Sequence, residues 1–96
     1  MNQDLKKAYQ EKTEAKIKEW SAKLSELKSK TTGLNQDAKE KINPKIEQLQ
    51  QKINQSKENL VQLRKLSQEN WQQAKAKLEG ISEGIKNAIG EIKSKM

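Results

Sequence analysis

Apolar residues recur along this chain at steps of three and four, and this spacing most constrains its fold. Such steps place side chains on one face of an α-helix, whereas a strand requires steps of two. From residue 46 to residue 67 the steps alternate between three and four without error, which is the heptad pattern of a coiled-coil seam. A further step of four, from Ser67 to Trp71, replaces the expected three and should relax or break the supercoil.

The fold predicted from this spacing is all-α: an antiparallel helical bundle or coiled coil of two to three long amphipathic helices. Lys, Glu, Gln, Ala and Leu, which favour helices, fill most of the chain. We expect a single helical domain over residues 1–96, with helices at about 3–31, 36–66 and 68–95. Helices of similar length favour an up-down-up arrangement.

Three places along the chain carry residues that begin or end helices. Gly33 suits a helix C-terminus, and Asn35 can cap the helix that follows. Asn43-Pro44 also resembles an N-cap followed by proline at the first helical position. The second helix therefore begins either near residue 36, with a kink at Pro44, or afresh at residue 44. Ser67 is a candidate cap for a third helix.

The residues predicted to form the buried seam are large, apolar and placed on the stripes of the three helices. A core role is favoured for both tryptophans over a role as ligand or lipid anchors, because burying a large aromatic contributes strongly to packing. The predicted seam consists of Trp20, Leu24, Leu27, Ile46, Leu49, Ile53, Leu60, Leu63, Trp71, Leu78, Ile81 and Ile85.

The C-terminal segment, residues 78–96, allows two interpretations. Its isoleucines share one face, but its three glycines each cost about 1 kcal/mol in a helix. The segment should therefore fray unless that face is covered. It is either a closing helix packed on the other two, where glycines can serve close approach, or an amphipathic segment that lies on a membrane or a partner helix.

Charged residues are expected to form a solvated helical surface. Acidic residues precede basic ones by four positions at several places, and each such pair is worth about 0.2–0.5 kcal/mol. Glu79 and Glu83 have the same spacing and are expected on the solvated face, not around a cation. The acid-before-base pairs are Glu14–Lys18, Glu19–Lys23, Glu26–Lys30, Asp37–Lys41 and Glu91–Lys95.

Composition excludes several classes of function. The chain has no Cys and no His, which removes thiol and imidazole catalysis, disulfides and the usual zinc sites. Only 18 residues are Leu, Ile or Val, too few to wall a deep substrate pocket. We therefore expect no catalytic, metal or cofactor-binding residues, no cofactor, no small-molecule substrate and no enzymatic activity.

Charge and hydropathy indicate which partners and which cellular compartment to expect. The net charge of +7 arises from 20 basic and 13 acidic residues, but the acids are interleaved and Arg64 is the single arginine. Nucleic acid is therefore an unlikely partner, because its binding favours Lys and Arg gathered on one face. The opening residues lack the apolar run of a signal peptide, and no membrane span is evident, so we expect a cytoplasmic protein.

A set of positions extends over most of the chain in one register: Lys7-Ala8-Tyr9, Glu11-Lys12, Ala15, Glu19-Trp20, Ala22, Leu27-Lys28, Ile46-Glu47, Leu49, Lys52, Leu60, Leu63, Ser67, Trp71, Lys75 and Glu79. This set resembles a family of small bacterial coiled-coil proteins of unknown function. The resemblance implies a helical, non-enzymatic bacterial protein. The chain departs from the family pattern at Gly33, Pro44, Ser82, Gly84 and Gly90.

Three hypotheses for function follow. The first is a structural or interaction protein that self-associates through the heptad seam or binds another helical protein. The second is a protein that associates reversibly with a membrane surface through amphipathic helices. The third is a stress or hydration protein, disordered when dilute, as suggested by a mean hydropathy of −1.15.

Overall fold

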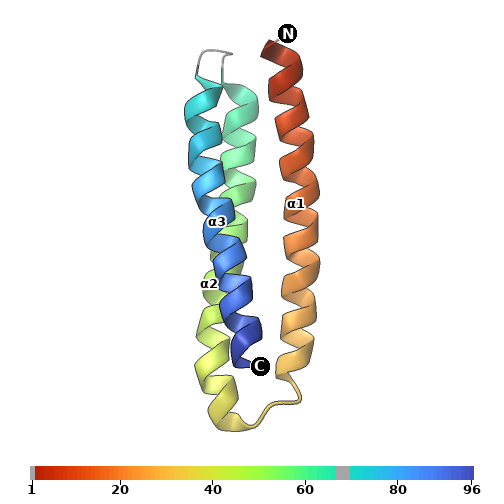
Figure 1. The fold of residues 1–96 in the computed structure, drawn as a ribbon, viewed down its shortest axis with the longest axis vertical. Coiled ribbons are helices and arrows are strands. Elements are labelled where there is room, and N and C mark those ends of the chain that lie inside the picture. Colours follow the sequence, from red (N-terminus) through yellow and green to blue (C-terminus); the bar gives the residue numbers. More distant parts are fainter. Residues whose placement is uncertain (1, 67–69) are drawn as a thin grey trace.

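Three long helices make up the computed structural model, which describes residues 2–66 and 70–96. Helix α1 spans Asn2–Thr31, α2 spans Gln36–Lys65 and α3 spans Trp71–Lys95. Successive helices run in opposite directions, so α1 and α3 start from the same end of a molecule measuring 52 × 18 × 17 Å (Figure 1). The predicted all-α antiparallel bundle is confirmed, and it has three helices.

The turn between α1 and α2 is closed by short-range hydrogen bonds. The backbone N–H groups of Thr32, Gly33 and Leu34 each donate to the carbonyl three residues earlier, at 3.1–3.3 Å. This tightens the end of α1 without a left-handed residue, because Gly33 does not have a positive φ. Asn35 then caps α2, as predicted: its side chain accepts a hydrogen bond from the Ala38 N–H at 2.9 Å.

Helix α2 is continuous through its proline. It begins at Gln36 and contains Pro44 as an internal residue, so the alternative of a fresh start at residue 44 is wrong. Ile42, two residues before the proline, is almost completely buried in the core. Packing of this side chain stabilises the helical turn that Pro44 weakens by removing a backbone donor. The predicted Ser67 cap of the third helix lies outside the described residues, and the first residue of α3 is Trp71.

The core follows the long axis of the bundle and has two parts. The larger cluster draws on all three helices and extends from Ile17 and Leu60 to the turn between α1 and α2. The smaller cluster consists of Leu63, Trp71 and Leu78, with Tyr9 of α1 packed against it. At the end where α1 begins, α1 therefore contributes one aromatic side chain to a core formed mainly by α2 and α3.

The C-terminal segment packs on the bundle as the end of α3. Ile85 and Ile92 are fully buried in the larger cluster. The glycines of this helix do not serve close approach at Gly80 and Gly90, because a Cβ added at either position would meet no atom within 4 Å. That part of the prediction is wrong.

Surface charges form fewer pairs along single helices than predicted. Glu26–Lys30 and Glu91–Lys95 lie at 3.3 and 3.6 Å. Among the described residues, the other predicted pairs are not within ion-pair distance, and Glu14 instead contacts Arg64 of α2. This contact joins α1 to α2 at the surface, where both side chains stay exposed.

Candidate interaction groove between α1 and α3

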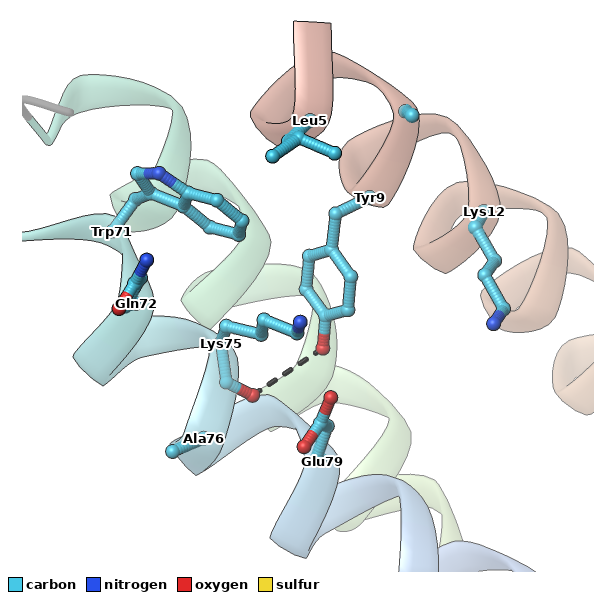
Figure 2. Close-up of a pocket in the computed structure, with 9 residues that line it drawn as sticks. Leu5, Tyr9, Lys12, Trp71, Gln72, Lys75, Ala76 and Glu79 are labelled. Atoms are coloured by element: carbon cyan, nitrogen blue, oxygen red, sulfur yellow. Dashed lines mark hydrogen bonds between the residues drawn. The ribbon is translucent and has the colours of Figure 1, made fainter. Parts of the chain in front are cut away.

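A groove of about 560 Å³ lies between α1 and α3 at the end of the bundle where both helices begin. Figure 2 shows its two walls, with Leu5, Tyr9 and Lys12 on α1 facing residues of α3. Figure 1 shows α1 farther from α3 at this end than at the other. The lining residues are Leu5, Ala8, Tyr9, Lys12, Trp71, Gln72, Lys75, Ala76 and Glu79.

The floor of the groove is aromatic. The ring centroids of Tyr9 and Trp71 lie 6.1 Å apart, with the planes tilted by 42°, within the range of favourable aromatic contacts. The Lys75 ammonium lies 5.5 Å from the Tyr9 centroid and 5.7 Å from the Trp71 centroid, which places it over both rings. One turn of α3 thus holds both a buried indole and a cation that covers it.

Tyr9 is the residue of α1 that closes this floor. Its hydroxyl donates a hydrogen bond to the Lys75 carbonyl at 3.3 Å, shown in Figure 2. Burial raises the pKa of Tyr9 above its usual value, and the negative charge of Glu79 raises it further. The phenol therefore remains protonated at neutral pH and keeps its donor role.

Some of the residues that line the groove present apolar side chains to solvent. Leu5 is 61% exposed, more than Val61 or Met96. Ala8 and Ala76 are also exposed and face the groove from opposite helices. Small side chains allow another helix to approach closely, and Leu5 offers an apolar contact beside them.

Charged residues extend the groove farther along the two helices. A second hollow of about 310 Å³ continues from Tyr9 and Lys12 toward the middle of the bundle. Its walls carry Lys16 on α1 and Glu83 and Lys86 on α3. The whole groove thus combines four lysines (Lys12, Lys16, Lys75 and Lys86) with two glutamates (Glu79 and Glu83).

Lys6 holds the start of α1 against the C-terminal end of α2. The Lys6 ammonium donates to the Leu66 carbonyl at 2.6 Å and to the Arg64 carbonyl at 3.3 Å. These carbonyls belong to the C-terminal end of α2, where positive charge is favourable. Lys6 therefore anchors α1 to α2 and leaves the side toward α3 open.

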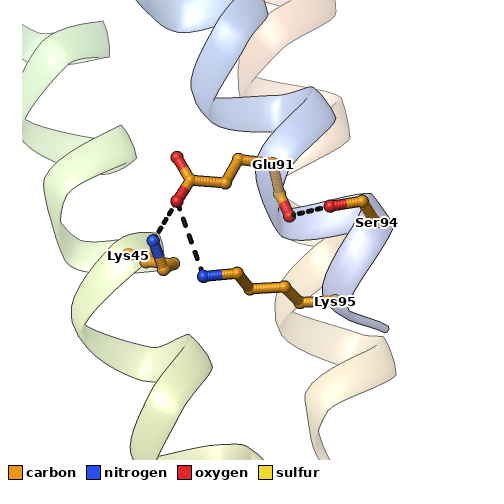
Figure 3. Close-up of polar contacts among 4 residues, drawn as sticks. All are labelled: Lys45, Glu91, Ser94 and Lys95. Atoms are coloured by element: carbon orange, nitrogen blue, oxygen red, sulfur yellow. Dashed lines mark hydrogen bonds and ion pairs between the residues drawn. The ribbon is translucent and has the colours of Figure 1, made fainter.

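The other end of the bundle is joined by charges. Glu91 of α3 contacts Lys45 of α2 and, within its own helix, Lys95 (Figure 3). The hydrogen bond with Lys45 lowers the pKa of Glu91 and raises the pKa of Lys45. The Ser94 hydroxyl donates to the Glu91 carbonyl at 2.8 Å. These contacts connect the end of α3 to α2, and their exposed positions are those of surface pairs.

The structure buries the predicted seam residues within one chain. Ile81 differs from the rest because it is only partly buried, packed against the larger cluster. Ile17, Ile42 and Ile92 also belong to the core and were missing from the predicted set, although each lies on the same apolar stripe. The buried seam residues are Trp20, Leu24, Leu27, Ile46, Leu49, Ile53, Leu60, Leu63, Trp71, Leu78 and Ile85.

The groove itself was not predicted. A signal for it is present in α1, where Leu5, Tyr9, Thr13 and Ile17 follow at steps of four and include only two aliphatic residues. A stripe this thin cannot cover both neighbouring helices. Glu79 and Glu83, which were expected on the solvated face, are exposed and line the groove.

The described residues lack both a cluster of metal ligands and a membrane-spanning helix. Residues 2–66 and 70–96 contain no group of three or more Asp or Glu side chains placed to hold a metal ion. No helix in this part of the chain is both long and apolar enough to cross a bilayer.

Comparisons of the chain with protein-family models, curated proteins and solved structures find no match. The resemblance to small bacterial coiled-coil proteins therefore stays a prediction, and function has to be argued from the groove and the core.

Proposed function

We propose that this protein is a non-enzymatic interaction module, a three-helix scaffold that binds another helical protein through the groove between α1 and α3. The observation that supports this most directly is the contrast between the two apolar surfaces. The seam is covered within one chain, whereas Leu5 is exposed along the groove and Tyr9 beside it is only partly buried. An exposed apolar surface with a polar surround is typical of a protein-binding site.

Self-association through the seam is disfavoured by the same packing. Leu49, Ile53 and Leu63 are fully buried between the helices of one chain, so a second copy reaches them only if the bundle opens. The net charge of +7 also opposes contact between two identical copies. Another protein is therefore the favoured partner over a second copy.

Membrane association is disfavoured for a related reason. The apolar face of α3 that would enter a lipid surface contains Ile85 and Ile92, which lie in the core. Exposing them requires α3 to leave the bundle, at a cost of about 1.5–3 kcal/mol for each isoleucine exposed. The groove needs no such rearrangement to meet a partner.

Site-specific photocrosslinking tests this proposal. A photoreactive amino acid replaces Leu5 in one variant and Val61 in a second. Val61 serves as control because it is also an exposed aliphatic residue, but it lies near the α1–α2 surface. We expect discrete protein adducts from position 5 that are absent from position 61 and that disappear when Ala76→Glu is added. Identical adducts from both positions, or none from position 5, would contradict a binding role for the groove.

A further inference from the structure

We infer that the partner presents an acidic amphipathic helix, which lies in the groove between α1 and α3 as a fourth helix of the bundle. This inference rests on the proposed function and adds the chemistry of the partner. Its basis is the juxtaposition of an aromatic floor, two exposed alanines and an excess of lysine along two adjoining hollows that share Tyr9, Lys12 and Glu79.

The dimensions of the groove match a helix. Its lining extends over residues 5–16 of α1 and residues 71–86 of α3, or about 18–24 Å at the usual helical rise. A helix of about 15 residues, roughly four turns, covers that length. Helices α1 and α3 run in the same direction and each supplies one wall of the groove (Figure 1). The groove is apolar near Leu5 and charged farther along.

The side chains on the walls define where apolar contacts of the partner fall. Ala8 of α1 and Ala76 of α3 line the groove with small, exposed side chains, and exposed Leu5 belongs to the α1 wall. Recognition of an amphipathic helix in a groove uses apolar anchors spaced at three and four residues. Such anchors would contact Leu5, the edge of Tyr9 and the alanines, while the polar face of the partner stays in solvent.

The charges of the groove select an acidic partner. Its four lysines outnumber its two glutamates, and the chain as a whole carries +7. Within the part of the chain that the structure describes, Lys12, Lys16 and Lys86 form no ion pair, so these ammonium groups can meet carboxylates of a partner. A basic helix, including a second copy of this chain, would meet like charge at the same positions.

Peptide binding to the full chain tests the chemistry of the partner. Two synthetic peptides of about 15 residues carry leucines on one helical face and either Glu or Lys on the other faces. Each is titrated into isotope-labelled protein, and backbone amide shifts are followed at physiological ionic strength. We expect the acidic peptide to bind at least about tenfold more tightly than the basic one, with shifts centred on Leu5, Ala8, Ala76 and Glu79, and to bind more weakly as salt is added.

Matched variants locate the binding. Ala76→Glu places a carboxylate in the groove and should weaken binding of the acidic peptide about tenfold or more, whereas Val61→Glu should leave it unchanged. The double variant Lys12→Glu with Lys16→Glu should reverse the preference, so that the basic peptide binds more tightly. Lys57→Glu, an exposed lysine of α2 outside the groove, is its control. Melting curves of all variants establish that they fold.

Several results would overturn the inference. Equal binding of both peptides, shifts centred outside the groove, or retained preference in the double variant would each do so. So would tighter binding of anionic phosphatidylglycerol vesicles or duplex DNA at these residues than of the acidic peptide. If position 5 forms protein adducts but the acidic peptide shows no preference, only the partner's chemistry is wrong. If position 5 forms no protein adducts, the proposed binding function itself is wrong.

Discussion

Single side chains decide how well this narrow core packs, and Ser56 is the least expected of them. It lies fully buried on the α2 stripe, and its hydroxyl has no hydrogen-bond partner. The Glu14–Arg64 and Lys28–Gln50 contacts fix the register of α1 against α2. This register places Ser56 close to the turn of α1 that carries Trp20. A small polar side chain therefore occupies a fully buried position, at the cost of an unsatisfied polar group.

Replacing Ser56 with alanine should therefore stabilise the protein. Ser56→Ala removes the buried hydroxyl without adding volume, and we expect the free energy of unfolding to rise by about 1 kcal/mol. Urea unfolding followed by circular dichroism measures the change. Ser25→Ala is the control, because Ser25 is exposed on α1 and reports only helix propensity. A gain no larger than that of the control would mean that the Ser56 hydroxyl is satisfied in solution.

Tyr9 gives a second prediction at the residue scale, in the alkaline range. Because burial and Glu79 raise the pKa of Tyr9 in the folded state, folding favours the protonated phenol. The associated stability is present below the unfolded pKa of about 10 and is lost as pH rises through the higher folded pKa. Tyr9 is the only tyrosine, so phenolate absorbance follows it directly. We expect a midpoint above 10 and a shallower alkaline loss of stability in Tyr9→Phe; a midpoint at or below 10 would contradict the packing of Tyr9.

At the scale of elements, the sequence predicted the helices better than their contacts. Periodicity and the Asn35 cap place α1 and α2 within a residue or two of their observed ends. The sequence left the start of α2 open, since Asn35 and Asn43 are both good caps; in the structure Asn35 caps a helix that continues through Pro44. The groove depends on how far α1 lies from α3, which no local pattern encodes. The reach of Lys6 to the end of α2 is likewise a tertiary contact.

The interior position of Pro44 predicts a gain on its removal. Proline within a helix costs about 3 kcal/mol relative to alanine, and glycine about 1. Since Pro44 is exposed and internal to α2, Pro44→Ala should raise the free energy of unfolding by up to about 3 kcal/mol, and Pro44→Gly by less. Thermal melts of the two variants and the wild-type protein show which substitution stabilises the fold more. If Pro44 were instead the first residue of a shorter helix, alanine would bring no gain.

At the scale of the whole molecule, the heptad stripe packs within one chain, whereas its pattern alone predicts contact between chains. Taken alone, the pattern from residue 46 to residue 67 predicts association between chains. In the structure, α1 and α3 supply matching stripes within the same chain and cover it. Linked partners meet at a high effective concentration, so the intramolecular seam forms before a second copy can compete. The stripe therefore forms a core within one chain, and the groove is the surface that we propose for a partner.

This interpretation predicts that unfolding is independent of protein concentration. A seam shared between chains would make the melting midpoint rise with concentration, whereas a seam closed within one chain would not. We expect identical circular dichroism melts over a hundredfold range and a sedimentation-equilibrium mass near 11.0 kDa throughout. Leu63→Ala should lower the midpoint equally at every concentration, because the fully buried leucine contributes about 2–5 kcal/mol within one chain. If the melting midpoint depends on concentration and Leu63→Ala dissociates an oligomer, the seam is an interface between chains and this interpretation is wrong.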